Sequence, residues 1–101
     1  RKLWIGFALP ASGRVVVDAG ARRALEDDQR SLLAAGIVQA EGRFEIDDAV
    51  EVVDEGGAVF AKGQVRWSSK DLDVHRGRRS NELPSHLPPE VIHRDDLVIL
   101  G

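Results

Sequence analysis

Short runs of β-branched and aliphatic residues, separated by turns that contain glycine, dominate the pattern of the chain. Three valines at 15–17 follow the turn signal Ala11-Ser12-Gly13 and predict a buried strand. Apolar runs at 50–53 and 59–65 stand on either side of Gly56-Gly57, a pattern typical of a β-hairpin. Further extended segments are predicted at 32–33, 37–40, 91–92 and 97–100, and residues 41–43 are predicted to form a turn.

Two short helices are predicted between these runs. Asp18 can cap a helix whose apolar residues return every three to four positions. Ser68 and Ser69 form a second capping pattern, and Gly77 would end that helix after about two turns. Prolines between residues 78 and 89 then predict a loop. Together these segments favour a small curled sheet or partial barrel, because a flat open sheet of this size would expose hydrophobic edges.

The amino-acid composition and net charge limit the classes of protein to which this chain can belong. The 101 residues, 43 % of them hydrophobic and 31 % charged, fit one folded domain. No cysteine is present, which excludes disulfides and thiolate zinc sites and agrees with a reducing, cytoplasmic location. No apolar stretch of about 18 residues predicts a membrane span, so we expect no contact with a membrane. The net charge of −3 argues against a surface that grips phosphate everywhere and leaves only a local basic patch.

A set of short segments resembles one known family in sequence and in order. The segments are residues 4–5, 17–21, 31–38, 41–44, 63–65, 67–72 and 91–98. They are similar to the C-terminal PUA domain of bacterial glutamate 5-kinases, and the resemblance covers nearly the whole chain. It implies a PUA-like pseudo-barrel of five to six strands with one or two short α-helices. It also implies that 1–101 is a single PUA domain, in which 1–13 come from an upstream amino-acid-kinase domain and 14–101 form the core.

The resemblance carries functional expectations. The parent protein would be a homo-oligomeric kinase that uses ATP and magnesium to phosphorylate L-glutamate to L-glutamyl 5-phosphate in proline biosynthesis. That chemistry would belong to the upstream domain, so this segment is expected to hold no catalytic residue and no cofactor. Its own role would be regulation or assembly of the kinase. The alternative is an RNA-binding module, because other PUA domains bind RNA.

Some positions depart from the family pattern. Ala34 stands where proline is frequent, Asp47-Asp48 where glycine-aspartate is common, and Arg66-Trp67 where asparagine-tyrosine is usual. We interpret these departures as loop and surface changes that leave the fold intact.

The candidate RNA-binding residues form two groups. By resemblance, the first helix, the strand after it and the segment before the last strand would face RNA. This face includes Gly20, Arg22, Arg23, Gly36 and Arg94. A local basic cluster follows the second helix, where arginine forks can hold phosphate oxygens and Trp67 would offer a stacking face. Its arginines are Arg76, Arg78 and Arg79. The same residues would also suit a solvated loop or a contact with the kinase domain, and the acidic net charge favours these alternatives.

Two sites of other classes receive little support from the sequence. His93-Arg94-Asp95 is similar to the catalytic loop of protein kinases, but the chain has no Gly-rich loop or Asp-Phe-Gly to complete that site. We therefore interpret the motif as a polar turn before the last strand. His75, His86 and His93 lack the spacing that places two imidazoles on one helix face, and we expect no metal site.

Overall fold

The computed structural model describes residues 4–100, with residues 6 and 7 described as backbone only. The strands are β1 (Ala11–Val17), β2 (Leu32–Leu33), β3 (Ile37–Gly42), β4 (Ala49–Asp54), β5 (Val59–Gln64), β6 (Glu90–Ile92) and β7 (Leu97–Ile99). The α-helices are α1 (Ala19–Asp27) and α2 (Ser69–His75). Single helical turns are η1 (Trp4–Ala8), η2 (Ala34–Gly36), η3 (Ser80–Glu82) and η4 (Arg94–Asp96). The predicted mainly β fold with short helices is confirmed, and very short strands raise the strand number above the five to six expected.

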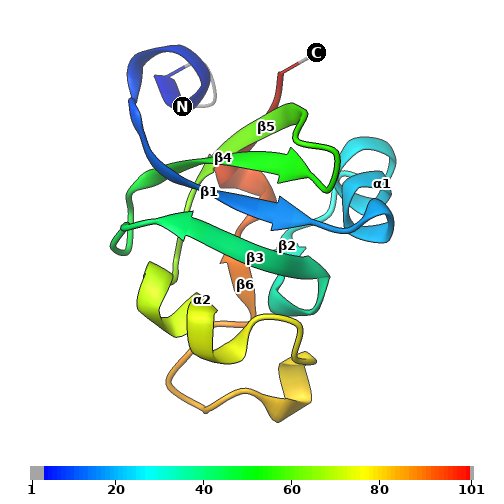
Figure 1. Cartoon of the computed structure of the whole chain (residues 1–101), viewed down its shortest axis with the longest axis vertical. Helices are drawn as coiled ribbons and strands as arrows, with labels where there is room; N and C mark the ends of the chain where they lie inside the picture. The colour runs from blue at the N-terminus through cyan, green and yellow to red at the C-terminus, as the bar shows by residue number, and fades with distance from the viewer. Residues whose placement is uncertain (1–3, 101) are drawn as a thin grey trace.

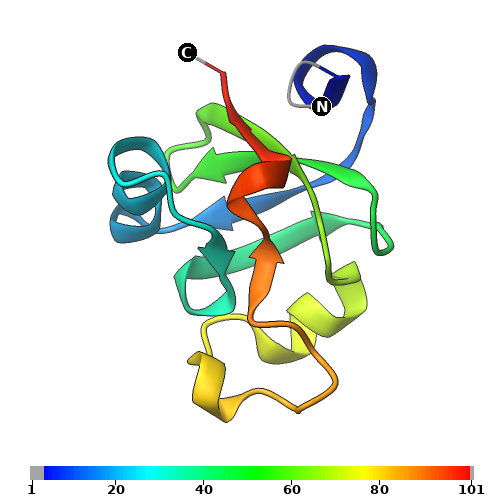
Figure 2. The same ribbon diagram turned by 180° about the vertical axis from the view of Figure 1, so that it is seen from behind.

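The strands form two sheets. The larger sheet has the order β3-β1-β4-β5-β7, and the smaller one pairs β2 with β6. Strand β1 runs antiparallel to β3 and parallel to β4, while β4 and β5 form the predicted antiparallel hairpin. Figures 1 and 2 show β6 behind the larger sheet, with α1 at one side and α2 below β3. The polypeptide is therefore wrapped around the space between the two sheets.

One hydrophobic core fills that space. Val15 and Val17 of β1 are fully buried, whereas Val16 between them is partly exposed, as the alternation of a strand requires. Strand β4 is central in the sheet and buries side chains on both faces, Val52 and Val53 among them. Side chains of this kind each contribute about 1.5–3 kcal/mol when removed from water. The valine-rich runs of the sequence therefore contribute a large part of the buried core.

The predicted helix caps are present. The Asp18 carboxylate accepts a hydrogen bond from the backbone N–H of Ala21 at 2.7 Å, at the start of α1. The Ser68 hydroxyl accepts one from the N–H of Asp71 at 3.2 Å, at the start of α2. Gly77 follows α2 with a φ of +81°, a left-handed conformation that favours glycine and ends the helix. Both helices therefore begin where the sequence predicts, and α2 also ends as predicted, before Gly77.

Three expected boundaries are wrong. Residues 11–13 do not form a turn, because Ala11 pairs with Ala49 and the strand β1 begins there. Residues 41–42 continue β3 rather than ending it, since Gly42 pairs with Gly13. The packed domain also begins before residue 14, because Ile5 is fully buried. Local turn propensity at these positions is overridden by pairing with neighbouring strands.

The interpretation of two family departures as loop and surface changes is also wrong. Trp67 is fully buried, and its indole N–H donates a hydrogen bond to the Pro88 carbonyl at 2.9 Å. Ala34 is 1 % exposed and belongs to the same core. The loop that contains Pro88 thus covers Trp67, so the aromatic ring helps to fix this loop and has no face free for stacking.

Candidate nucleic-acid interface

Helix α1 holds its first arginine in an internal network. The Nε of Arg22 donates to Glu26 Oε1 at 2.8 Å, one helical turn along. Its Nη1 pairs with Asp54 at the end of β4, and its guanidinium lies 4.6 Å from the centre of the Phe60 ring. The hydrogen bond to Glu26, and secondarily the pair with Asp54, raise the pKa of Arg22. Arg22 is therefore committed to contacts within the domain.

Asp54 anchors this network from the hairpin. Its Oδ1 accepts hydrogen bonds from the backbone N–H groups of Gly56 and Ala58, at 3.0 and 2.9 Å. The hydrogen bond from Ala58 and the one from Arg22 hold the pKa of Asp54 below its ordinary value of 3.8. The carboxylate thus closes the β4–β5 turn with one oxygen and binds Arg22 with the other.

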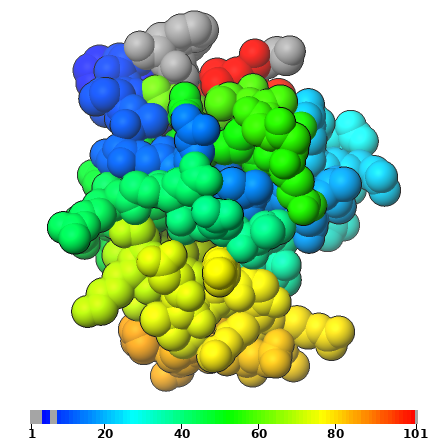
Figure 3. Space-filling view, in the orientation of Figure 1, coloured from blue at the N-terminus to red at the C-terminus, as the bar shows by residue number. Residues whose placement is uncertain are grey.

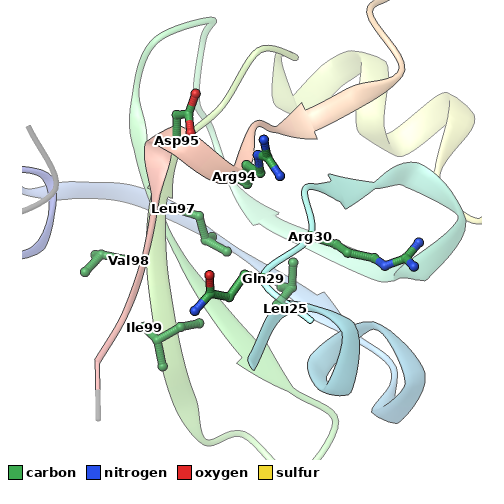
Figure 4. A pocket seen from close by; sticks show the side chains of 8 residues that line it. All are labelled: Leu25, Gln29, Arg30, Arg94, Asp95, Leu97, Val98 and Ile99. Carbon is green, nitrogen blue, oxygen red and sulfur yellow. The ribbon is translucent and has the colours of Figure 1, made fainter. Parts of the chain in front are cut away.

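A groove lies beside the C-terminal end of α1. It has a volume of about 370 Å³ and runs between the segment after α1 and the segment from η4 to β7 (Figure 4). Arg30 comes from the first segment and Arg94 from η4, so two arginines line one cavity, and Figure 4 shows the Arg30 side chain extending outward from it. We call this cavity the arginine groove, and its lining residues are Leu25, Gln29, Arg30, Arg94, Asp95, Leu97, Val98 and Ile99.

Two backbone features position these arginines. Gln29 has a φ of +52°, which turns the chain sharply after α1 and leads directly into Arg30. The Ser31 hydroxyl accepts a hydrogen bond from the backbone N–H of Arg94 at 2.9 Å. This bond joins segments that are 63 positions apart in the sequence. The two walls of the arginine groove are therefore fixed relative to each other by Ser31.

The two groove arginines are available for an external anion. Both are exposed, and among residues 4–100 neither guanidinium makes a hydrogen bond or an ion pair. Asp95 contributes a carboxylate to the same wall, but its side chain is 77 % exposed and lies 3.5 Å from His93 Nδ1. The arrangement presents two exposed planar cations on the rim of a cavity that apolar side chains also line. Such a surface can hold phosphate or carboxylate oxygens bidentately.

The other predicted RNA-binding residues are spread over the surface. Arg23 and Gly20 are exposed on α1. Arg76, Arg78 and Arg79 are exposed in the loop after α2, where Arg78 Nη1 lies 3.3 Å from His75 Nδ1. Figure 2 shows this loop at the opposite end of the domain from the end of β7. The structure therefore brings Arg94 together with Arg30 and leaves the loop arginines as a separate group.

Gly36 has a structural reason for being glycine. A Cβ atom built on Gly36 would lie 2.6 Å from the Cβ of Ala21 in α1. The close packing of η2 against α1 therefore requires a residue without a side chain. At Gly20, a Cβ would meet only Asp18 Oδ1 at 3.5 Å, which is an ordinary contact.

Arg30 is the groove residue that sequence reasoning missed. It follows the acidic residues Asp27 and Asp28, which mask a local basic signal in the sequence. The sequence feature that could have pointed to Arg30 is its position between the end of a predicted helix and the apolar pair at 32–33. Only the hydrogen bond between distant segments reveals that it lies beside Arg94.

Within the described part of the chain, the other candidate chemistry does not assemble. No group of three or more His, Cys, Asp or Glu side chains in residues 4–100 could hold a metal ion. His93 caps η4 by accepting from the N–H of Asp95 at 3.1 Å, so the predicted polar turn before the last strand is confirmed. No helix within these residues is long and apolar enough to span a bilayer.

Comparison with known proteins identifies the fold family. The family profile described as the PUA domain matches residues 13–87. This chain belongs to the PUA domain family. A PUA domain from Aeropyrum pernix K1, solved as a tartrate complex, superposes with a TM-score of 0.59 at 27 % identity, over 84 % of this chain and 45 % of that one.

Curated relatives of this PUA domain share one name. The glutamate 5-kinase of Citrifermentans bemidjiense is 45 % identical over 104 residues, which is 99 % of this chain and 28 % of the relative. That of Gloeobacter violaceus is 43 % identical over 106 residues, covering 100 % of this chain and 29 % of the relative. The match lies in the C-terminal portion of these proteins. The PUA domain thus spans less than a third of the curated relatives it matches.

Proposed function

We propose that this PUA domain is the non-catalytic C-terminal module of a glutamate 5-kinase, and that it regulates the kinase or helps to assemble it. The observation that carries the proposal is the 45 % identity to such an enzyme over 99 % of the chain. A match of this extent includes the core, the turns and the segments between them. The role of a surface module agrees with the arrangement of residues 4–100, which is a packed core bordered by exposed grooves.

The proposal places the chemistry outside this domain. An upstream amino-acid-kinase domain of the same polypeptide would use ATP and magnesium to phosphorylate the γ-carboxylate of glutamate. The described residues lack a cluster that could hold a metal ion, and Gly56-Gly57 lies in the β4–β5 turn rather than before a helix. The parent protein would be a cytoplasmic homo-oligomer, in which residues 1–101 form one domain.

The test compares the full-length protein with a variant that lacks residues 1–101. Glutamyl phosphate is trapped with hydroxylamine, and the product is measured against proline and magnesium concentration, while light scattering gives the oligomeric state. We expect the shortened protein to retain phosphotransfer and to change in proline inhibition, magnesium dependence or assembly. Unchanged values of all three would contradict a regulatory or assembly role. Absence of glutamate-dependent turnover in the full-length protein would contradict the parentage.

The arginine groove favours a second candidate function, binding of structured RNA. Its support is the pair Arg30 and Arg94, which border one cavity and are not engaged by carboxylates within residues 4–100. Arg23 and the loop arginines Arg76, Arg78 and Arg79 would extend contact along the phosphate backbone. Arg22 is a weaker candidate than predicted, because RNA phosphates would compete with Glu26 and Asp54 for its guanidinium.

An NMR titration of the protein with a structured RNA, at low and moderate salt, tests this candidate. Arg30→Ala and Arg94→Ala should each weaken binding and lower the slope of log K against log salt by about one, because one phosphate contact is lost. Arg43→Ala is the matched control, since Arg43 is exposed and lies outside the groove. No chemical-shift change at low salt, or equal losses in all three variants, would rule out this interface.

A further inference from the structure

One end of the PUA domain exposes a group of large apolar side chains. Trp4 is 62 % exposed and Leu100 is 42 % exposed, with Val59 and Ile99 both at 38 %. They come from η1, from the first residue of β5 and from the end of β7, and η1 contacts both of these strands. Figures 1 and 3 show η1 in blue and the end of the chain in red at the same end of the molecule. We call these four residues the apolar end.

The polypeptide that leads into the domain is packed against this end. Ile5 is fully buried, and the Leu9 carbonyl accepts a hydrogen bond from the side-chain ammonium of Lys62 in β5. The N–H of Leu9 donates to the Trp4 carbonyl at 3.2 Å, which closes the turn. Residues 4–9 are held in this way, so the N-terminal end of the described residues lies fixed on the surface at Trp4.

We propose that the apolar end is the surface on which the preceding catalytic domain of the same polypeptide docks. This inference rests on the proposed function, in which the kinase domain occupies the remaining part of a protein of which this chain covers about 28 %. An exposed tryptophan on a turn that contacts two strands with exposed aliphatic side chains has the composition of an interface centre rather than of an ordinary surface. Its position at the connection to the preceding polypeptide selects that polypeptide as the occupant.

Because the two domains would belong to one polypeptide, a small interface is sufficient for them to dock. The effective concentration of one domain at another is near 1 mM when a short linker joins them. An interface with an intrinsic dissociation constant near 0.1 mM is then formed about 90 % of the time. A second copy of the chain at micromolar concentration has no such advantage. Docking at the apolar end would hold the PUA domain in a fixed orientation and would cover Ile99, which also lines the arginine groove.

The test uses the full-length protein and hydroxyl-radical footprinting. Trp4 is the exposed tryptophan of this domain and Trp67 the fully buried one, so Trp67 gives an internal reference for protection. The double variant Val59→Ser and Leu100→Ser removes apolar contacts without touching the probe. We expect Trp4 modification to rise about tenfold in this variant, as a 90 % closed interface opens. Val74→Ser is the matched control, because Val74 is 58 % exposed on α2, outside the apolar end, and should leave the rate unchanged.

Each outcome decides between the alternatives. Equal Trp4 modification in the wild-type protein and the double variant would overturn docking. Protection of Trp4 that increases with protein concentration would also overturn it, because a second copy would then be the occupant. Glutamate-dependent phosphotransfer is measured on the same samples. Phosphotransfer with an unprotected Trp4 would reject docking and leave the proposed function standing, whereas protection without phosphotransfer would reject the glutamate 5-kinase parentage and support docking on a different preceding domain.

Discussion

The apolar end and the arginine groove lie on the same small scaffold and differ in their chemistry. The apolar end is built from aliphatic and aromatic side chains around the N-terminal turn η1. The arginine groove is built from cations on two segments that Ser31 joins. Apolar surface binds without strong geometric demands, while guanidinium groups require an anion placed in their plane. The first surface fits a partner that is covalently attached, and the second fits a soluble anionic partner.

The two surfaces also share one support. Strand β7 ends in the apolar end, and its residues Leu97, Val98 and Ile99 line the arginine groove. Strand β7 is held by pairing with β5, where Ala61 lies opposite Ile99. Ile99 belongs to both surfaces, so an event at one surface can reach the other through β7. Substitutions that change burial, packing or charge one at a time test whether the two surfaces are independent.

The largest expected effect contrasts the two tryptophans. Trp67→Ala removes a fully buried side chain and its hydrogen bond to Pro88, so it should lower the free energy of unfolding by about 3–5 kcal/mol. Trp4→Ala alters an exposed side chain and should change the stability of this domain by no more than about 0.5 kcal/mol. Urea unfolding followed by circular dichroism measures both. Equal losses would mean that Trp4 belongs to the core rather than to a docking surface.

A smaller contrast concerns two glycines of the predicted RNA face. Gly36→Ala should destabilise the domain by about 1–3 kcal/mol, because its Cβ would press on Ala21 and separate η2 from α1. Gly20→Ala places a Cβ in ordinary contact and should be neutral or stabilise α1 by up to about 1 kcal/mol. Thermal unfolding of both variants checks the signs. A stable Gly36→Ala variant with impaired RNA binding would instead assign Gly36 to the interface.

These contrasts indicate what the sequence could and could not predict. The hairpin and both helix caps depend on residues close together in the sequence, and they were predicted correctly. The capture of Arg22 by Asp54 joins residues 32 positions apart, and the position of Arg94 depends on Ser31, 63 positions away. Spacing along the chain carries no signal for such contacts. The burial of Trp67 was missed for the same reason, since the loop that covers it is distant in sequence.

For this reason, the sequence predicts membership of the family better than it predicts the binding site. Membership of the PUA family depends on many separated segments, each of which contributes to the resemblance. A binding surface depends on whether a few cations are left without ion pairs inside the domain. Arg22 and Arg30 differ in this respect, although both lie in or beside α1. Arg22 pairs with Glu26 and Asp54, whereas Arg30 forms no ion pair within the described residues 4–100. Whether an arginine is available to an external ligand therefore depends on its tertiary contacts.

The smallest expected effect tests the carboxylate that holds Arg22. The pKa of Asp54 is lowered in the folded domain, first by the hydrogen bond from Ala58 and also by Arg22. A lowered pKa means that the folded state binds fewer protons than the unfolded state as the pH falls through the carboxyl range. Asp54 therefore stabilises the fold above its unfolded pKa near 3.8, and this contribution is lost as the pH falls toward the lower, folded value.

Asp54→Asn isolates this contribution. The asparagine carbonyl can still accept from Gly56 and Ala58, so the β4–β5 turn is kept while the negative charge beside Arg22 is removed. The urea midpoint of the variant should lie below that of the wild type at about pH 6, and the two should converge as the pH falls below the lowered pKa of Asp54, where both side chains are neutral. A constant difference over this range would show that the loss arises from packing rather than from charge. If the released Arg22 also strengthens RNA binding at low salt, then its pairing with Asp54, and not its position on α1, is what separates it from the arginines of the groove.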